Sequence, residues 1–389
     1  MSATTRREYL LAIWGRYRRV GRQFRSKILD EFCQVCGYAR KYAIRLLGQN
    51  PRRRRRRKGP RPRYGPEVLA VLKPIWLASD QLCSKRLKAA LPIWLPHFER
   101  RCGPLRWELR RQVLAISAAT IDRLLRPLRV RYRRRGLSGT RPGSLLIHRV
   151  PIRTDHTDAT QPGLLEADTV AHCGPSLAGQ FVWSLTFTDI YSQWTENRAV
   201  WNKGATEVVE RLAEIEKHLP FAIRGFDVDN GSEFLNHHLW RYWAQRPQPI
   251  AFTRSRPYKK NDQAHVEQKN WTHVRQLLGY DRIERLDLVP AINELYRTWS
   301  LYHNFFCPNL KLLRKTRRGS RLRKTYYPPR TPYAVLLACP QIAPEQKERL
   351  RATFQTLDPF ALKEKLETQL RTLFHHLRSG NSIVESTKT

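Results

Sequence analysis

Three acidic residues in the sequence occupy positions that packing alone does not explain. Asp168 lies inside an apolar, strand-like stretch at 163–172, where a carboxylate is costly unless a metal or another partner compensates it. Asp229 ends a second strand-like stretch, 221–229, and an Asn-Gly turn signal follows it directly. Glu267 lies in a segment with helical character. Because 60 residues separate the first two acids and 37 separate the last two, the set spans several elements of one domain.

Three carboxylates form the kind of ligand set that phosphoryl transfer with two Mg²⁺ ions uses. Mg²⁺ prefers oxygen ligands and keeps several waters, so a few carboxylates and a substrate phosphate complete its coordination. Paired ions about 4 Å apart activate the attacking oxygen and stabilise the leaving one, and the protein supplies no covalent nucleophile. In this hypothesis Asp168 bridges both ions of an active site, Asp229 holds one and Glu267 the other, with Mn²⁺ able to substitute.

Other polar residues compete for the same role. Strand alternation places Glu166 on the same face as Asp168. It likewise places Asp227 on the face of Asp229, so the residues alone leave Asp227 open as a ligand. We interpret His172 as structural or close to DNA, because no second His or Cys pair nearby completes a zinc site. Further acids lie close in the chain: Asp155, Asp158, Asp189 and Glu233.

The stretches around these acids alternate between strand and helix. β-Branched and aromatic residues at alternating positions predict strands, and apolar residues at helical spacing predict helices. The expected strands are 163–172, 181–192, 194–201, 221–229 and 249–255, and the expected helices are 205–218, 234–245 and 262–278. This order predicts an α/β core at 159–285 with a mixed five-stranded sheet.

The charge of the chain indicates a polyanionic partner. The 389 residues include 72 Lys and Arg against 33 Asp and Glu, a formal net charge of +39. Nucleic acid is favoured, because each neutralised phosphate releases counterions. Ribosomal-type RNA binding and an anionic membrane surface are the alternatives. No apolar stretch is long enough to span a membrane, and the seven cysteines suggest no disulfide framework, so a cytoplasmic protein is expected. We interpret the pair Cys33 and Cys36 as two thiols on a helix.

The region before the core predicts two helical DNA-binding domains joined by basic linkers. Helices separated at Gly37 in 1–50, and a helix beginning near Ala118 in 66–130, each suggest a helix-turn-helix; a helical hairpin and a solvated arginine edge are the alternatives. The linkers are 51–65 and 131–158. The residues expected to contact DNA here are Arg52, Arg53, Arg54, Arg55, Arg56, Arg57, Arg123 and Arg126.

Cations also surround the helix of Glu267. We expect Lys259, Lys260, Lys269 and Arg275 to hold the DNA backbone, although each of them is equally well explained as a solvated charge. After the core, residues 286–389 form a basic and helical region. It includes a helix within 296–310, an irregular basic run at 314–330, and a helical stretch at 341–378 that packs on the core or mediates assembly.

Four strings in the core resemble a known family. LLEADTVAHCG, WSLTFTDIYSQWTE, DVDNGSEF and NDQAHVEQKN are similar to the integrase core of bacterial insertion-sequence transposases, the DDE group that shares an RNase H-like fold with retroviral integrases. The resemblance covers about residues 160–280, and the upstream helix-turn-helix pair fits the same family. It implies that Asp168, Asp229 and Glu267 are the catalytic, metal-binding triad, and it suggests that the basic run at 314–330 contacts DNA.

The resemblance also implies a reaction and partners. We expect cleavage of transposon ends and 3′-OH strand transfer into target DNA, by a homo-oligomer assembled on DNA in the bacterial cytoplasm, associated with the nucleoid and not with a membrane. Two rivals remain: a metal-dependent DNA nuclease without strand transfer, and a catalytically silent DNA-binding regulator derived from a transposase. The intact acidic set argues against the regulator.

Overall fold

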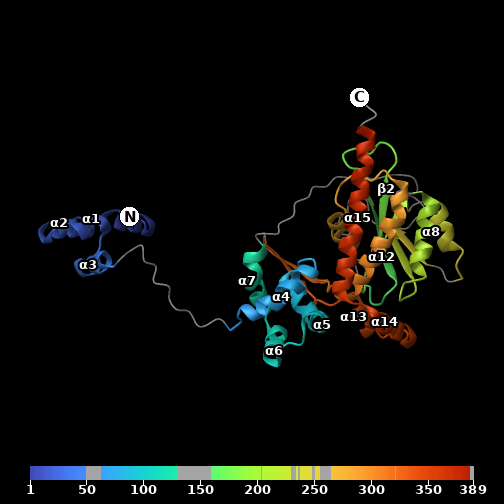
Figure 1. Ribbon diagram of the computed structural model, residues 1–389, viewed down its shortest axis with the longest axis horizontal. Coiled ribbons are helices and arrows are strands. Elements are labelled where there is room, and N and C mark those ends of the chain that lie inside the picture. Colours follow the sequence, from blue (N-terminus) through green and yellow to red (C-terminus); the bar gives the residue numbers. More distant parts are fainter. Residues whose placement is uncertain are drawn as a thin grey trace. The chain divides into compact units, whose positions relative to one another are not determined.

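The computed structural model describes residues 1–49, 63–129, 159–202, 204–228, 234, 237–247, 250–254, 264–319 and 321–385. The chain divides into two compact units, Met1–Arg63 and Tyr64–Thr389 (Figure 1). No helix among these residues is both long and apolar enough to cross a bilayer.

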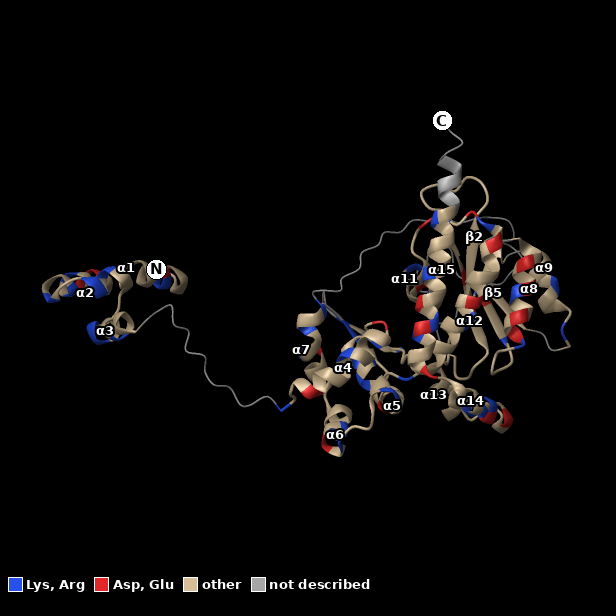
Figure 2. Cartoon of the chain, in the orientation of Figure 1, with Lys and Arg blue, Asp and Glu red and all other residues tan. Residues whose placement is uncertain are grey.

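The first unit is three helices around a small apolar core. They are α1 (Ala3–Arg19), α2 (Arg22–Cys36) and α3 (Arg40–Gly48). Gly37 adopts a left-handed φ of 67° and ends α2 with a bond from its N–H to the Cys33 carbonyl, which confirms the expected break. Phe32 is fully buried at the centre, and Lys and Arg lie along the outside of α2 and α3 (Figure 2). Cys33 and Cys36 of α2 form no disulfide.

The second unit begins with four more helices. They are α4 (Pro66–Ala78), α5 (Ser84–Cys102), α6 (Trp107–Ala115) and α7 (Ala118–Arg129). Ser117 caps α7, because its hydroxyl oxygen accepts the N–H of Thr120 at 3.2 Å. The helical character expected for 66–130 is therefore confirmed.

These helices do not have a separate hydrophobic core. The indole of Trp94 on α5 is fully buried against rings from α12 (Val289–Phe306) and α15 (Pro359–Glu385), and its Nε1 donates to the carbonyl of Phe306 at 2.9 Å. Tyr302 on α12 donates to the carbonyl of Ala78 at 2.6 Å. The predicted domains 66–130 and 286–389 thus share one core.

The centre of the second unit is a mixed five-stranded sheet, as the sequence predicts. Its order is β3-β2-β1-β4-β5, with β1, β2 and β3 antiparallel and with β4 and β5 parallel to β1. The strands are β1 (Leu164–Ala171), β2 (Val182–Asp189), β3 (Thr195–Trp201), β4 (Gly225–Val228) and β5 (Ala251–Arg254).

The two faces of this sheet differ in polarity. One face is apolar and packs on α8 (Ala205–Glu216) and α9 (His237–Ala244). The other face carries buried polar residues, namely Glu166, Ser184, Thr186, Thr188, Asn197 and Asp227. It is covered by α12 and by one continuous helical segment made of α10 (Ala264–Lys269), the π-helix η1 (Asn270–Arg275) and α11 (Gln276–Leu278).

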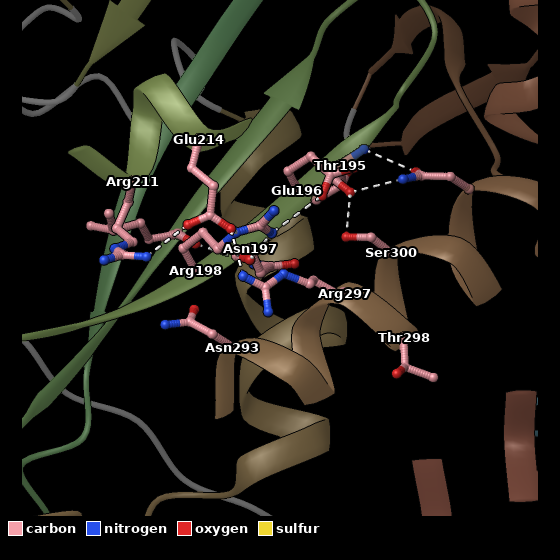
Figure 3. A network of polar contacts seen from close by, with 12 residues as sticks. Thr195, Glu196, Asn197, Arg198, Arg211, Glu214, Asn293, Arg297, Thr298 and Ser300 are labelled. Atoms are coloured by element: carbon pink, nitrogen blue, oxygen red, sulfur yellow. Dashed lines mark hydrogen bonds and ion pairs between the residues drawn. The ribbon is translucent and has the colours of Figure 1, made fainter. Parts of the chain in front are cut away.

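Side chains close the outer edge of β3. The amide of Asn304 bonds both backbone groups of Thr195, each at 3.0 Å, and the amide of Asn293 bonds the N–H and the carbonyl of Ala199 at 2.7 and 3.0 Å. Both asparagines lie on α12, which therefore takes the place of a sixth strand. Figure 3 shows Asn293 on this helix beside β3. An open strand edge is a template for unwanted pairing, so this arrangement protects the sheet.

An ionic network ties α8 and α12 around the same edge. Glu214 on α8 accepts from Arg198 of β3 at 3.2 Å, from Arg211 at 2.7 Å and from Arg297 of α12 at 2.8 Å (Figure 3). Burial opposes its ionisation, but the bond from Arg297 and the charge of Arg198 lower the pKa of Glu214 to about 2. Glu214 therefore stays ionised and balances the buried guanidinium of Arg198.

The C-terminal region contains a β-hairpin where the sequence predicts an irregular run. Instead of an irregular run at 314–330, the chain forms antiparallel strands β6 (Leu312–Arg318) and β7 (Arg321–Tyr326). Gly319, with a φ of 58°, permits the tight turn between them. The hairpin is followed by α13 (Pro332–Ala338), α14 (Pro344–Thr356) and α15, and the last of these packs on α12.

The amide of Asn293 is expected to be essential for stability. Asn293→Ala leaves the buried N–H and carbonyl of Ala199 without their partner, which costs about 2 to 4 kcal/mol. Urea denaturation followed by circular dichroism measures the loss. Glu294→Ala, on the exposed side of the same helix, is the control and should change stability by under about 1 kcal/mol. Equal losses in the two variants would contradict the edge-closing role.

Candidate active site

The polar face of β1 carries two carboxylates at the centre of the sheet. Glu166 and Asp168 lie two residues apart, so their side chains share this face, as alternation predicts. Glu166 is buried, with 2% of its surface exposed, whereas Asp168 is half-buried. The opposite face of the strand is apolar, because Leu165 and Ala167 pack in the core beneath α8 and α9.

Asp227 joins these carboxylates through strand pairing. It stands directly opposite Glu166 in the parallel register of β1 and β4, and it is fully buried. Thr253 of β5 lies opposite Asp227 in turn and donates its hydroxyl to Oδ1 at 2.6 Å. Asp227 therefore lies on the same side of the sheet as Glu166 and Asp168.

Asp229 lies outside the described residues. The described register of β1 and β4 ends with Ala167 opposite Val228, the two residues that immediately precede Asp168 and Asp229. Within the part of the chain that the structure describes, no three His, Cys, Asp or Glu side chains come close enough to share a metal ion.

The helix of Glu267 is fastened to the two carboxylates of β1. The backbone N–H of Val266 donates to Glu166 Oε2 at 3.0 Å, and Asn270 Nδ2 donates to Asp168 Oδ2 at 2.5 Å. Glu267 lies between these two anchored residues and its side chain is exposed. The structure thus brings the helix of one predicted acid directly against the strand of another, although 98 residues lie between Asp168 and Glu267.

Asn270 and Glu166 are site residues whose roles sequence reasoning missed. Asn270 begins the π-helical turn η1, and a π-helical turn inside an α-helix is frequent at functional sites. The extra residue per turn changes which side chains face the sheet. Helical periodicity in the sequence gives no signal of such a turn, so the bond between Asn270 and Asp168 was not predictable.

Two polar residues near the site have structural roles. Asp189 accepts the N–H of Gly163 at 2.9 Å and the N–H of Ser192 at 2.7 Å, which fixes the ends of β1 and β2; burial raises the pKa of Asp189 to about 6. His172 is fully buried and bonds Ser184 Oγ at 2.7 Å, and burial lowers the pKa of His172 to about 3. His172 is therefore neutral and structural.

The expected DNA-contacting cations lie in different environments. Arg123 and Arg126 on α7 are exposed. Lys269 is not a surface cation: only 5% of it is exposed, and burial, with the nearby charge of Arg86, lowers the pKa of Lys269 to about 7. Arg275 is half-buried, with its guanidinium 4.7 Å from the ring centroid of Tyr280. Arg52, Arg53, Arg54, Arg55, Arg56, Arg57, Lys259 and Lys260 lie outside the described residues.

Comparison with known proteins places the chain in a family. No protein-family model matches it. The uncharacterized protein y4rM of Sinorhizobium fredii (strain NBRC 101917 / NGR234) is 44% identical over 342 residues, which are 86% of this chain and 95% of that protein. The chain therefore belongs to the family of y4rM.

The buried His172 is expected to make the protein sensitive to acid. The pKa of His172 is about 3 in the folded state and about 6.5 in the unfolded chain. Between pH 3 and pH 6.5 the imidazole is therefore protonated in the unfolded state but not in the folded state. Stability from this residue is present above pH 6.5 and is lost as the pH falls, by about 3 kcal/mol at pH 4. His172→Gln should reduce the loss, measured as the fall in free energy of unfolding from pH 7 to pH 4. His376→Gln, at an exposed position, should leave it unchanged.

Proposed function

We propose that this protein is a DNA transposase of the DDE group, with an RNase H-like core whose triad is Asp168, Asp229 and Glu267. The observation that carries the proposal is the junction of the central strand with the helix of Glu267, made by the bonds of Glu166 to Val266 and of Asp168 to Asn270. The sheet order, with three antiparallel strands followed by two parallel ones, supports the RNase H-like assignment.

The donors of the proposed triad suit Mg²⁺. All three are carboxylates, the hard oxygen ligands that Mg²⁺ prefers, and each oxygen has two lone-pair positions. Asp168 Oδ1 accepts the N–H of Thr169 at 2.7 Å, and Oδ2 accepts the side-chain amide of Asn270 at 2.5 Å. Two bound Mg²⁺ ions would supply activation of the attacking oxygen and stabilisation of the leaving oxygen.

The chain's own residues position the triad. Asn270 and the backbone N–H of Thr169 fix the orientation of the Asp168 carboxylate. Glu166 holds the first turn of α10 and thereby the position of Glu267 along the sheet. Because the opposite face of β1 is packed against a continuous apolar core, the strand has little freedom to move.

The other regions fit a protein that brings two DNA ends together. The helices of the first unit and α4 to α7 are proposed as helix-turn-helix modules that recognise element ends, with Arg123 and Arg126 on the exposed side of α7. The core hydrolyses one phosphodiester to release a 3′-OH, and this hydroxyl then attacks target DNA. Joining two ends requires a homo-oligomer on DNA, and the net charge of +39 favours binding to its phosphates.

Removal of any triad carboxylate should abolish cleavage and strand transfer. Asp168→Asn, Asp229→Asn and Glu267→Gln each remove a proposed metal ligand, so the rate should fall by more than about 100-fold, the upper range for changes to outer-shell partners. Labelled element-end DNA with Mg²⁺ or Mn²⁺ measures both steps, and a parallel binding assay should show unchanged affinity. Asp281→Asn, at an exposed position after α11, is the control and should retain activity.

The outcomes separate the proposed function from its rivals. A wild type that cuts but never joins pre-cleaved ends is a nuclease. A wild type that binds element ends and cuts under no metal is a silent regulator. A triad variant that cuts as well as the wild type shows that the wrong acid was assigned.

Asn270 is expected to act as a positioning residue. Asn270→Ala removes the N–H donor from Asp168, so we expect a rate about 10 to 100 times lower and a higher Mg²⁺ concentration for half-maximal rate. Asn270→Gln, which keeps the amide, should recover part of the activity. DNA affinity should not change in either variant. A lower rate with an unchanged Mg²⁺ dependence would contradict positioning through Asp168.

A further inference from the structure

The hairpin of β6 and β7 is a two-stranded ribbon with an unusual charge. Residues 312–326 contain seven Lys and Arg and no Asp or Glu. The side chains of Arg314, Arg317, Arg323 and Lys324 are exposed, and none of these four takes part in an ion pair with a described carboxylate. The ribbon pairs with no other described strand. We infer that it is a DNA-contacting element that lies in the major groove of the duplex.

The register of the ribbon makes it self-repelling. Lys315 stands directly opposite Lys324, and Arg318 stands directly opposite Arg321. Like charges directly opposite each other destabilise an antiparallel pair, and a two-stranded hairpin by itself is only marginally stable. Neutralisation by a polyanion removes this repulsion, so binding to phosphates stabilises the ribbon as well as the complex.

The cations are distributed over both faces, and this favours a groove. Cross-strand partners share a face, so Arg314 and Arg323 belong to one face, and Arg317 and Lys324 belong to the other. A flat anionic surface such as a membrane engages one face only. The major groove of B-DNA, about 12 Å wide, admits a two-stranded ribbon with phosphates on both sides. The major groove of A-form RNA is too deep and narrow for this.

The base of the ribbon is held in place by the core. Asn309 and Arg330 bond each other's backbone at 2.8 and 3.3 Å, and Tyr327 donates to the carbonyl of Lys311 at 2.9 Å. The carbonyl of Pro308, just before this bridge, accepts from Arg86 of α5 at 2.5 Å. The strands therefore extend from a fixed root, which reduces the conformational entropy that is lost when the ribbon enters a groove.

The salt dependence of DNA binding by the full chain tests this inference. The ribbon variant carries Arg314→Gln, Arg317→Gln and Arg323→Gln. A matched variant carries Arg349→Gln, Arg371→Gln and Arg378→Gln, three exposed arginines of α14 and α15. Fluorescence anisotropy with a 30-base-pair duplex of mixed sequence is measured over a salt series in EDTA. Cleavage is not required, so the outcome is independent of the catalytic assignment. Thermal melting checks that both variants fold.

The ribbon variant should bind more weakly than the wild type, with a slope of log affinity against log salt that is shallower by about 2 to 3. The matched variant should retain the wild-type slope, and Arg→Lys at the same three ribbon positions should retain most of it. Three outcomes overturn the inference: an unchanged slope in the ribbon variant, an equal change in the matched variant, or an equal loss of affinity for an A-form RNA duplex of the same length.

Discussion

Most polar residues on one face of the central sheet are buried, and a buried polar group is costly unless it is hydrogen-bonded. This requirement fixes the position of the helices above it. Glu166 takes the backbone N–H of Val266 and Asp168 takes the amide of Asn270, so the segment from α10 to α11 crosses the sheet where the carboxylates are. An apolar face would accept a helix in several positions, whereas this face accepts one that satisfies its acids. The contacts that hold this helical segment on the sheet are consequently the same contacts that position the candidate site.

The helix α12 connects the sheet that carries the candidate site to the rest of the second unit. One side of it closes β3 with the amides of Asn293 and Asn304, and another side presents Tyr302 and Phe306 to Trp94 of α5. A single helix thereby joins the sheet, the helices before it and the C-terminal helix into one core. In the proposed function, this shared core gives any DNA contact made by α4 to α7 a fixed position relative to the carboxylates of β1.

The few acids of this strongly basic chain serve as internal partners. Glu214 balances Arg198, and Asp189 fixes a turn. In the first unit, Glu31 of α2 accepts hydrogen bonds from Tyr9 and Arg16 of α1 and so joins the two helices. Many cations remain exposed, for example on α7 and on the ribbon of β6 and β7. These exposed cations are available to a polyanion.

The sequence by itself determined the order of the strands and helices, and it showed that an acidic residue lies within an apolar strand. These features depend on alternation, turn residues and capping, which act over a few neighbouring residues. Gly37 and Ser117 illustrate such local control. It did not show the hairpin at 312–326, where like charge suggested irregularity. Only the tertiary structure decided that Asn270 meets Asp168, that Lys269 is buried and that asparagines close β3. Those contacts are between residues far apart in the chain. Neither a π-helical turn nor a contact at a sheet edge produces a periodic pattern in the sequence.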